Sequence, residues 1–136
     1  MPTNLEIIRS TYAGKSEENG KRIQAYLAED AQWTEAPGFP YAGTYIGPDQ
    51  VATHVFARLA SEWEGYKAEV RDYYQDGDTV IAVGVYSGTY KQTGKHFEAD
   101  FVHIWKLQNQ KIVNYKQYVD SYLVRNAMSS EYLPSY

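Results

Sequence analysis

The sequence has no cysteine, no long apolar run and no basic cluster, and each absence narrows the range of possible functions. Without cysteine the chain forms no disulfide, no thiolate metal site and no cysteine nucleophile. No apolar run approaches the roughly 20 residues that a membrane-spanning helix needs. The 136 residues carry 13 basic and 17 acidic side chains, a formal charge of −4, without the basic stripe typical of nucleic-acid-binding proteins. We therefore expect neither nucleic acid nor a membrane as a partner.

The sequence signatures of common cofactor and nucleophile sites are also missing. It contains no glycine-rich phosphate-binding motif and no Gly-x-Ser-x-Gly turn. Its three histidines, His54, His96 and His103, lack the short spacing of a metal site. The first four residues do not resemble the start of a secretory signal. We expect a cytoplasmic protein with one domain, residues 1–136, and with no metal or cofactor.

The aromatic content is high, with 14 tyrosines, 4 phenylalanines and 3 tryptophans, and the hydrophobic period changes near Gly65. Before Gly65 the spacing is helical, and the expected helices are residues 3–14, 21–29 and 49–65. Alternation predicts the strands, which are residues 31–35, 66–75, 79–90, 97–105 and 111–120. A loop rich in proline and glycine spans residues 37–48. Helices followed by a meander of strands indicate an α+β fold in which a curled sheet covers the helices around a central pocket.

The C-terminal extension, residues 121–136, is too apolar to be a free tail. Its apolar residues are Leu123, Val124, Met128, Tyr132 and Leu133. We expect this extension to be ordered and to pack over the mouth of a cavity or against a partner subunit.

The strand expected at residues 97–105 organises the rest of the chain. Alternation places one imidazole, His103, between Phe101 and Trp105 on a face that is otherwise apolar. Two interpretations fit this pattern: a core histidine with satisfied hydrogen bonds, or a polar group on the wall of a pocket. The opposite face carries Val102 and Ile104, and an apolar outer face of this kind predicts a homodimer.

Several segments make the sequence resemble the nuclear transport factor 2-like fold, and within it the SnoaL-like branch related to ketosteroid isomerases and polyketide cyclases. These segments are residues 29–35 (EDAQWTE), 43–47 (GTYIG), 101–105 (FVHIW), 111–113 (KIV) and 117–120 (QYVD). The resemblance implies a cone-shaped, curved mixed or antiparallel sheet wrapped around three N-terminal helices, a cystatin-like α+β roll that encloses a pocket. Such proteins commonly form homodimers. The family includes isomerases, cyclases, epoxide hydrolases, dehydratases and non-catalytic binding domains, so the resemblance leaves the reaction open.

The resemblance also implies three catalytic positions. Ketosteroid isomerases use a carboxylate base at the end of the first strand, which falls at Glu35, and a tyrosine on the first helix, which falls at Tyr12. Their second oxyanion donor is a protonated aspartic acid, and His103 occupies that position here. If the strand is displaced by an odd number of residues, Asp100 faces the cavity instead of His103. Glu35 also fits a solvated strand end, and Tyr12 also fits core packing.

The candidate substrate-binding residues are mostly aromatic, as suits an apolar ligand. They are Trp33, Phe39, Phe56, Phe101, Trp105, Gln117 and Asp120. We expect Gln117 to hydrogen-bond His103 across the strand pair, and Asp120 either to pair with Arg125 or to cap the C-terminal extension. In a dry pocket, burial raises the pKa of Glu35 and lowers the pKa of His103.

Two functions follow from these residues, and both stay open at this stage. The first is a cofactor-free acid/base enzyme of isomerase, cyclase or hydrolase type, acting on a small apolar carbonyl or epoxide compound. The second is a non-catalytic ligand-binding or dimerisation module with the same fold.

Overall fold

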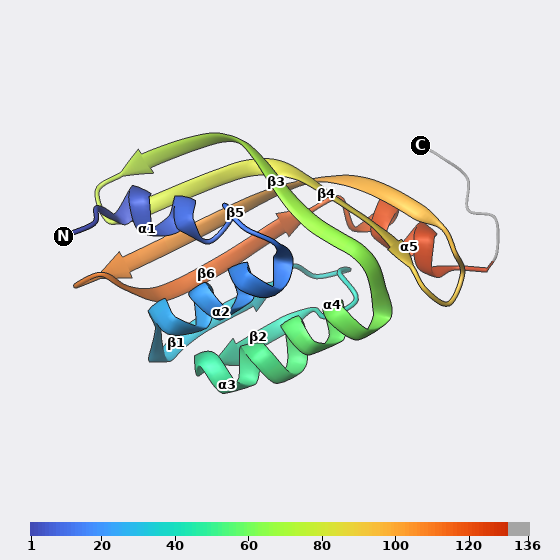
Figure 1. Ribbon diagram of the computed structural model, residues 1–136, viewed down its shortest axis with the longest axis horizontal. Coiled ribbons are helices and arrows are strands. Elements are labelled where there is room, and N and C mark those ends of the chain that lie inside the picture. The colour runs from blue at the N-terminus through green and yellow to red at the C-terminus, as the bar shows by residue number, and fades with distance from the viewer. Residues whose placement is uncertain (131–136) are drawn as a thin grey trace.

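A curved six-stranded sheet with the order β2-β1-β6-β5-β4-β3 dominates the computed structural model, which describes residues 1–130 (Figure 1). In chain order the strands are β1 (Leu27–Glu35), β2 (Gly43–Ile46), β3 (Trp63–Asp76), β4 (Thr79–Tyr90), β5 (His96–Gln108) and β6 (Lys111–Val119). Strands β1 and β6 run parallel, and the other neighbouring pairs are antiparallel. The sheet is therefore mixed, and it does not close into a barrel because β2 and β3 remain its edges.

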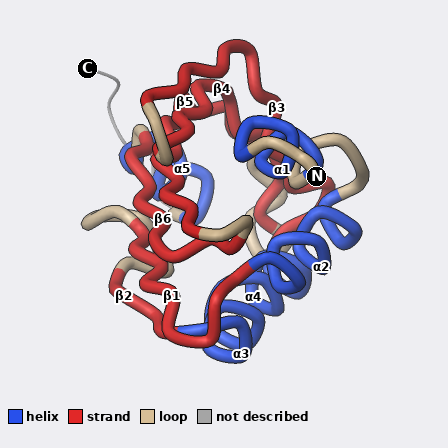
Figure 2. Tube along the Cα trace, turned by 90° about the vertical axis from the view of Figure 1, so that its left-hand side faces the viewer, coloured by secondary structure: helices blue, strands red, loops and turns tan. Residues whose placement is uncertain are grey.

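The helices before β3 lie along the inner side of the curl, as Figure 2 shows from a perpendicular direction. The helices of the whole chain are α1 (Asn4–Ser10), α2 (Ser16–Tyr26), α3 (Gly47–Val51), α4 (Ala57–Glu62) and α5 (Ser121–Met128), with a π-helical turn η1 (Ala52–Phe56) that joins α3 to α4. The first helix begins where the sequence predicts it. Thr3 accepts a hydrogen bond from the backbone of Glu6, whose carboxylate accepts one from the backbone of Thr3. The α+β class and the helices inside the curl are confirmed.

The second helix differs from its predicted bounds. It begins at Ser16, so the pair Asn19 and Gly20 lies inside the helix and does not break it. The side-chain amide of Asn19 exchanges two hydrogen bonds with the backbone of Gly14 and fastens the preceding turn. A Cβ atom at position 20 would lie 3.4 Å from the ring of Phe56, so glycine there lets α2 approach η1 closely.

Several strand boundaries also differ, and β1 begins at Leu27, within the helix expected at residues 21–29. Residues 43–46, expected as part of a loop, form the edge strand β2, which pairs with β1 so that Gly43 lies opposite Glu35. Trp63, expected in the third helix, is the first residue of β3. The chain leaves α4 in extended conformation at Trp63, and the ring is buried against the sheet.

The C-terminal extension packs within the protein as far as the structure describes it. Helix α5 lies against β5 and β4, with Val124 and Ala127 buried. Asp120 caps this helix, because its carboxylate accepts a hydrogen bond from the backbone of Leu123 at 3.4 Å. Tyr132 and Leu133 lie outside the described residues.

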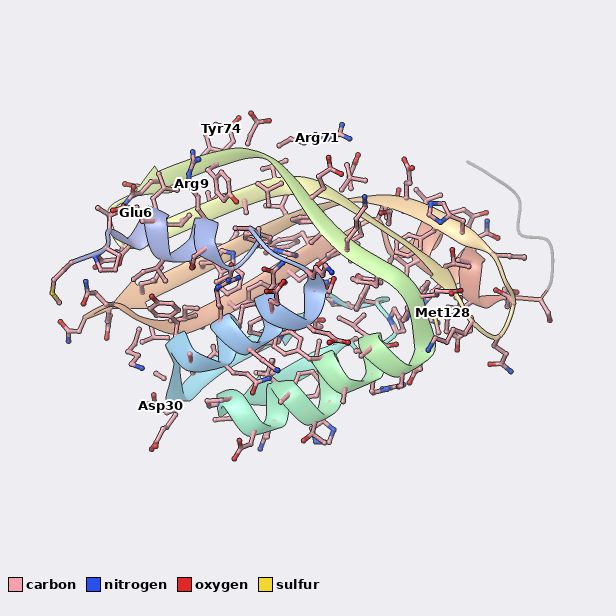
Figure 3. All side chains as sticks on the ribbon, in the orientation of Figure 1. Glu6, Arg9, Asp30, Arg71, Tyr74 and Met128 are labelled. Atoms are coloured by element: carbon pink, nitrogen blue, oxygen red, sulfur yellow. The ribbon has the colours of Figure 1, made fainter. Side chains whose placement is uncertain are left out.

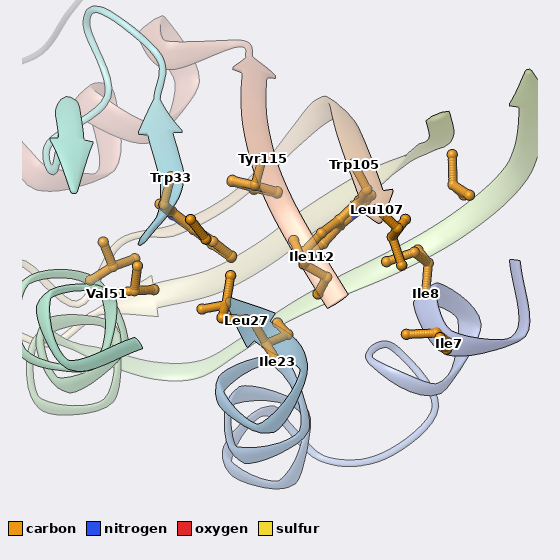
Figure 4. Close-up of a cluster of buried hydrophobic side chains, with 13 residues drawn as sticks. Ile7, Ile8, Ile23, Leu27, Trp33, Val51, Trp105, Leu107, Ile112 and Tyr115 are labelled. Carbon is orange, nitrogen blue, oxygen red and sulfur yellow. The ribbon is translucent and has the colours of Figure 1, made fainter. Parts of the chain in front are cut away.

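Two groups of buried apolar side chains pack between the sheet and the helices. The first is shown in Figure 4 and includes Ile7, Ile8, Ile23, Leu27, Trp33, Val51, Trp105, Leu107, Ile112 and Tyr115. The second is Phe39, Tyr41, Trp63, Tyr86, Phe97, Ala99, Phe101, Val124 and Ala127. Tyr12 and Leu59 pack against both groups, so these two residues mark the boundary between them.

Candidate functional site

A cavity of about 1110 Å³ lies between the inner face of the sheet and the helices. The predicted site residues that line it are Tyr12, Trp33, Glu35, Phe56, His103, Trp105 and Gln117. They come from the turn after α1, from β1, η1, β5 and β6, so the fold brings distant segments of the chain to one place. The three residues for which the family resemblance implies catalysis share this cavity.

Three predicted substrate-binding residues lie outside the lining that the described residues form. Phe39 is buried against the ring of Tyr86. Phe101 shares the inner face with His103 but lies behind it, with the two rings stacked at 4.1 Å between centroids. Asp120 caps α5, as described above. Their positions favour packing and capping over ligand contact.

Glu35 is the last residue of β1 and is 3% exposed. Its Oε2 atom is buried and has no hydrogen-bond partner among the described residues. Burial raises the pKa of Glu35 to about 8, and the indole of Trp33, two residues back on the same face, offsets part of this rise. The indole N–H itself forms no hydrogen bond of ordinary geometry with any residue that the structure describes. At pH 7 Glu35 is therefore mainly a neutral carboxylic acid with one unengaged oxygen.

His103 points inward and is 4% exposed, whereas Asp100 lies on the outer face and is exposed. His103, and not Asp100, therefore faces the cavity. The hydroxyl of Tyr12 lies 2.5 Å from Nδ1 of the imidazole, and the hydroxyl of Tyr86 contacts Nε2. Burial lowers the pKa of His103 to about 3, so the ring is neutral at pH 7. The direction agrees with the expectation that desolvation dominates at this position.

The two tyrosine hydroxyls are themselves held by donors from neighbouring strands. The indole N–H of Trp105 donates to the hydroxyl of Tyr12 at 2.9 Å, and the side-chain amide of Gln117 donates to the hydroxyl of Tyr86 at 2.8 Å. A neutral imidazole donates one hydrogen bond and accepts one. Both nitrogens of His103 are therefore already engaged within the protein, between two tyrosines of fixed position.

Gln117 reaches His103 only through Tyr86, which corrects the expected direct hydrogen bond. Gln117 and His103 are paired across β6 and β5 and face the same side. The amide nitrogen nevertheless extends to Tyr86, while its oxygen accepts a hydrogen bond from the backbone of Ala36 at 3.0 Å. Gln117 thereby joins the residue after Glu35 to the tyrosine that holds His103.

Tyr86 and Tyr66 line the cavity but were not predicted as site residues. Alternation along residues 79–90 places Tyr86 on the same face as Ala82 and Gly84, which is the buried face of β4. This was the available signal for Tyr86. Tyr66 gave no such signal, because a register irregularity falls between Glu64 and Lys67.

The remaining histidines do not contribute to the cavity lining among residues 1–130. The ring of His54 stacks on Tyr45, and His96 lies 3.2 Å from the hydroxyl of Thr89. Within the described part of the chain, no three histidine, cysteine, aspartate or glutamate side chains are grouped to hold a metal ion. No helix in that part is both long and apolar enough to cross a membrane.

Comparison with known proteins adds a family to this geometry. The family model of the SnoaL-like domain matches residues 8–115. No protein with a curated description matches the chain. A solved structure of an NTF2-like protein from Burkholderia thailandensis E264 is 42% identical and has a TM-score of 0.89, and the match covers 95% of this chain and 99% of that one.

Two further solved structures share the fold at lower identity. TerC, co-crystallised with polyporic acid, is 23% identical with a TM-score of 0.81, over 93% of this chain and 98% of TerC. A candidate SnoaL-like polyketide cyclase from Shewanella putrefaciens CN-32 is 16% identical with a TM-score of 0.76, over 96% and 99%. The family match covers both the β1 carboxylate and the β5 histidine. This chain belongs to the SnoaL-like domain family and has the NTF2-like fold.

Proposed function

We propose that this protein is a cofactor-free acid/base catalyst that moves a proton on a small, largely apolar carbonyl compound bound in the cavity. The observation that carries the proposal is the carboxyl of Glu35, which is buried, has one unengaged oxygen and has a pKa raised to about 8. A carboxyl whose pKa lies near the operating pH is suited both to accept and to return a proton. The surrounding aromatic side chains of Trp33, Phe56 and Trp105 suit an apolar substrate frame.

The proposed step needs only one carboxylate and one substrate. Ionised Glu35 takes a proton from the carbon next to the carbonyl, the C–H electron pair becomes a carbon–carbon double bond, and the carbonyl electron pair moves onto oxygen. The carboxylic acid then returns the proton, either to the same carbon or to another carbon of the conjugated system, which isomerises the substrate. Hydrogen-bond donors at the developing oxyanion lower the barrier to this step.

The comparisons support a small organic ligand for a cavity of this kind. TerC was crystallised with polyporic acid, and the Shewanella protein is described as a candidate polyketide cyclase. Both are less than 25% identical to this chain, so they support the class of ligand and not its identity.

Deuterium exchange tests this function without knowledge of the natural substrate. A panel of small ketones in D₂O is followed by NMR for loss of the protons next to the carbonyl. We expect the wild-type protein to accelerate exchange of at least one ketone, and Glu35→Gln to abolish the acceleration while ligand affinity stays within about tenfold, or 1.4 kcal/mol. Glu29→Gln is the matched control, because Glu29 lies on the same strand but is exposed. Exchange that persists in Glu35→Gln contradicts the proposal.

A ligand-binding module without catalysis is the second candidate, and one observation favours it. Tyr12, His103 and Tyr86 satisfy one another's hydrogen bonds, so neither imidazole nitrogen is free for a substrate. Under this alternative, ketones bind in the cavity but the exchange experiment shows no acceleration by the wild-type protein.

We also propose that the outer face of the sheet forms a homodimer. Val83, Val102 and Tyr118 are paired across β4, β5 and β6 on this face, and Ile81 lies opposite Ile104. Tyr118 is 48% exposed and the two valines are partly exposed, which leaves an apolar patch on the outside. The charged residue Arg71, which projects from β3 in Figure 3, stands at the margin of the sheet.

A further inference from the structure

Four tyrosines line the cavity, and the hydroxyl of one of them, Tyr66, has no hydrogen-bond partner among the described residues. Tyr12 and Tyr86 are engaged with His103, and the hydroxyl of Tyr115 interacts with that of Tyr86. The hydroxyl of Tyr66 is nevertheless fully buried. A buried hydroxyl without a partner is costly, since it has given up hydrogen bonds with water. This donor is therefore available to a ligand in the cavity.

The ring of Tyr66 is fixed in place by aromatic neighbours. Its centroid lies 5.4 Å from that of Tyr86, 5.8 Å from that of Trp63 and 5.9 Å from that of Phe97. The backbone is also close to the next strand, because a Cβ atom at Gly88 would lie 3.2 Å from the Cα atom of Tyr66. With the ring held on several sides, the hydroxyl has a defined position, as a preorganised donor requires.

Glu35 and Tyr66 are close enough to influence each other electrostatically. Burial raises the pKa of Tyr66 well above 10, and the charges of Tyr86 and Glu35 raise it further. The phenol therefore keeps its proton throughout the neutral range and remains a donor. A ligand that fills the space beside Glu35 thus meets a second polar group, on β3, that has no partner among residues 1–130.

We propose that Tyr66 donates a hydrogen bond to the carbonyl oxygen of the substrate while Glu35 moves the proton. This inference rests on the proposed function and assigns to Tyr66 the part that the family resemblance implies for Tyr12 and His103. Tyr12 and His103 are instead hydrogen-bonded to each other and hold that part of the cavity wall in place. The ligand class is a ketone on an apolar frame, whose oxygen accepts the hydrogen bond from Tyr66.

Matched ketone and hydrocarbon probes test the inference by binding alone. We use 2-tetralone and tetralin, which share a bicyclic frame and differ by one carbonyl, and measure both dissociation constants for each protein. We expect the wild-type protein to prefer the ketone at least tenfold, and Tyr66→Phe to reduce that preference about tenfold. Tyr90→Phe should keep the preference, because Tyr90 contacts the ring of Trp63 but does not line the cavity. Tyr12→Phe should reduce it less than Tyr66→Phe.

The urea midpoint provides a second readout that does not depend on any ligand. Tyr66→Phe removes a buried hydroxyl that has no partner in the described part of the chain, so the urea midpoint of the variant should equal or exceed that of the wild-type protein. A lower midpoint means that the hydroxyl is engaged within the protein and overturns the inference. An unchanged ketone preference in Tyr66→Phe, or no preference in the wild-type protein, also overturns it.

Deuterium exchange of 2-tetralone separates this inference from the proposed function. If the wild-type protein shows the Tyr66-dependent preference but no accelerated exchange, the proposed catalysis fails and Tyr66 remains a binding residue. If exchange is accelerated and depends on Glu35 but not on the hydroxyl of Tyr66, catalysis stands and the role of Tyr66 is wrong.

Discussion

The hydroxyl of Tyr12 lies 2.5 Å from Nδ1 of His103, although 91 residues separate the two in the chain. The same hydroxyl accepts a hydrogen bond from the indole of Trp105, which is two residues beyond His103 on β5. The turn after α1 is thereby fastened to the middle of the sheet at the boundary of the two cores. Removal of this hydroxyl leaves two buried polar groups without their partner.

Tyr12→Phe should therefore destabilise the protein. We expect the free energy of unfolding to fall by about 1–3 kcal/mol, the usual cost of leaving buried hydrogen-bonding groups unpaired. Urea denaturation followed by tryptophan fluorescence measures the change. Tyr74→Phe is the control, since Tyr74 is 58% exposed on the outside of β3 and should change the stability little (Figure 3). Equal stabilities of the two variants would show that the hydroxyl of Tyr12 is solvated.

The stability of the protein should depend on pH through Glu35. Its pKa is about 8 in the folded protein against an ordinary value of 4.5, so the folded state holds a proton that the unfolded state releases. The stabilisation that this proton gives to the folded state is complete below pH 4.5. It is lost by about 1.4 kcal/mol per pH unit as the pH rises toward 8. Glu35→Gln cannot ionise and lacks this loss. As the pH rises from 5 to 9, the urea midpoint of the wild-type protein should therefore fall relative to that of Glu35→Gln. Parallel pH profiles of the two proteins would contradict the raised pKa of Glu35.

His103 should remain neutral far into acid. Its folded pKa of about 3 lies below the ordinary 6.5, so the unfolded state binds a proton first and stability is lost as the pH falls from 6.5 toward 3. NMR of the labelled imidazole should show no titration of His103 between pH 5 and 8. It should show two nitrogens of different character, one protonated and one accepting a hydrogen bond. A midpoint near 6.5 would mean that water reaches the ring.

Alternation along β5 is the part of the site that the sequence predicts well. Side chains of a strand point to opposite faces in turn, so Phe101, His103 and Trp105 had to share the inner face once the strand was recognised. Alternation does not predict, however, which of the residues on the inner face line the cavity. Phe101 stacks on His103 and is not part of the cavity lining that residues 1–130 form, although both residues have the same parity.

Other features escaped prediction for identifiable physical reasons. Strand β2 is short and mostly exposed, so its sequence shows no alternation, and only its backbone pairing with β1 defines it. In β3 the register shifts between Glu64 and Lys67 and again between Val70 and Asp72. Each irregularity reverses which residues face inward. For this reason Tyr66 could not be assigned to the cavity from its position in the sequence.

The outer sheet face leads to a prediction about assembly. Sedimentation at micromolar concentration should give twice the 15.6 kDa chain mass. Stable dimers bury about 1,200 Å² or more, and the paired residues Val83 and Val102 and the pair Ile81 and Ile104 give this face an apolar centre. Val102→Asp places a charge in the centre of that surface and should give the monomer mass. Glu98→Lys, an exposed change on the same strand, should remain dimeric. If the wild-type protein sediments with the mass of a single chain, the outer face does not form a dimer.

The pH dependence of proton exchange tests Glu35 most directly. Under the proposed function only the ionised form of Glu35 removes a proton, so the exchange rate should rise with pH, reach half its maximum near pH 8 and level off above about pH 9. Two pH units below the midpoint, at pH 6, about 1% of the carboxyl is ionised, and the rate should be about a hundredfold below the plateau. The rate should not fall again below pH 10, because the pKa of Tyr66 lies well above 10 and its phenol stays protonated. Measurements with buffer concentrations extrapolated to zero separate the enzyme rate from buffer catalysis. A midpoint between 4 and 5 would instead place the carboxyl in water, outside a dry cavity, and would contradict the role of Glu35 as the base.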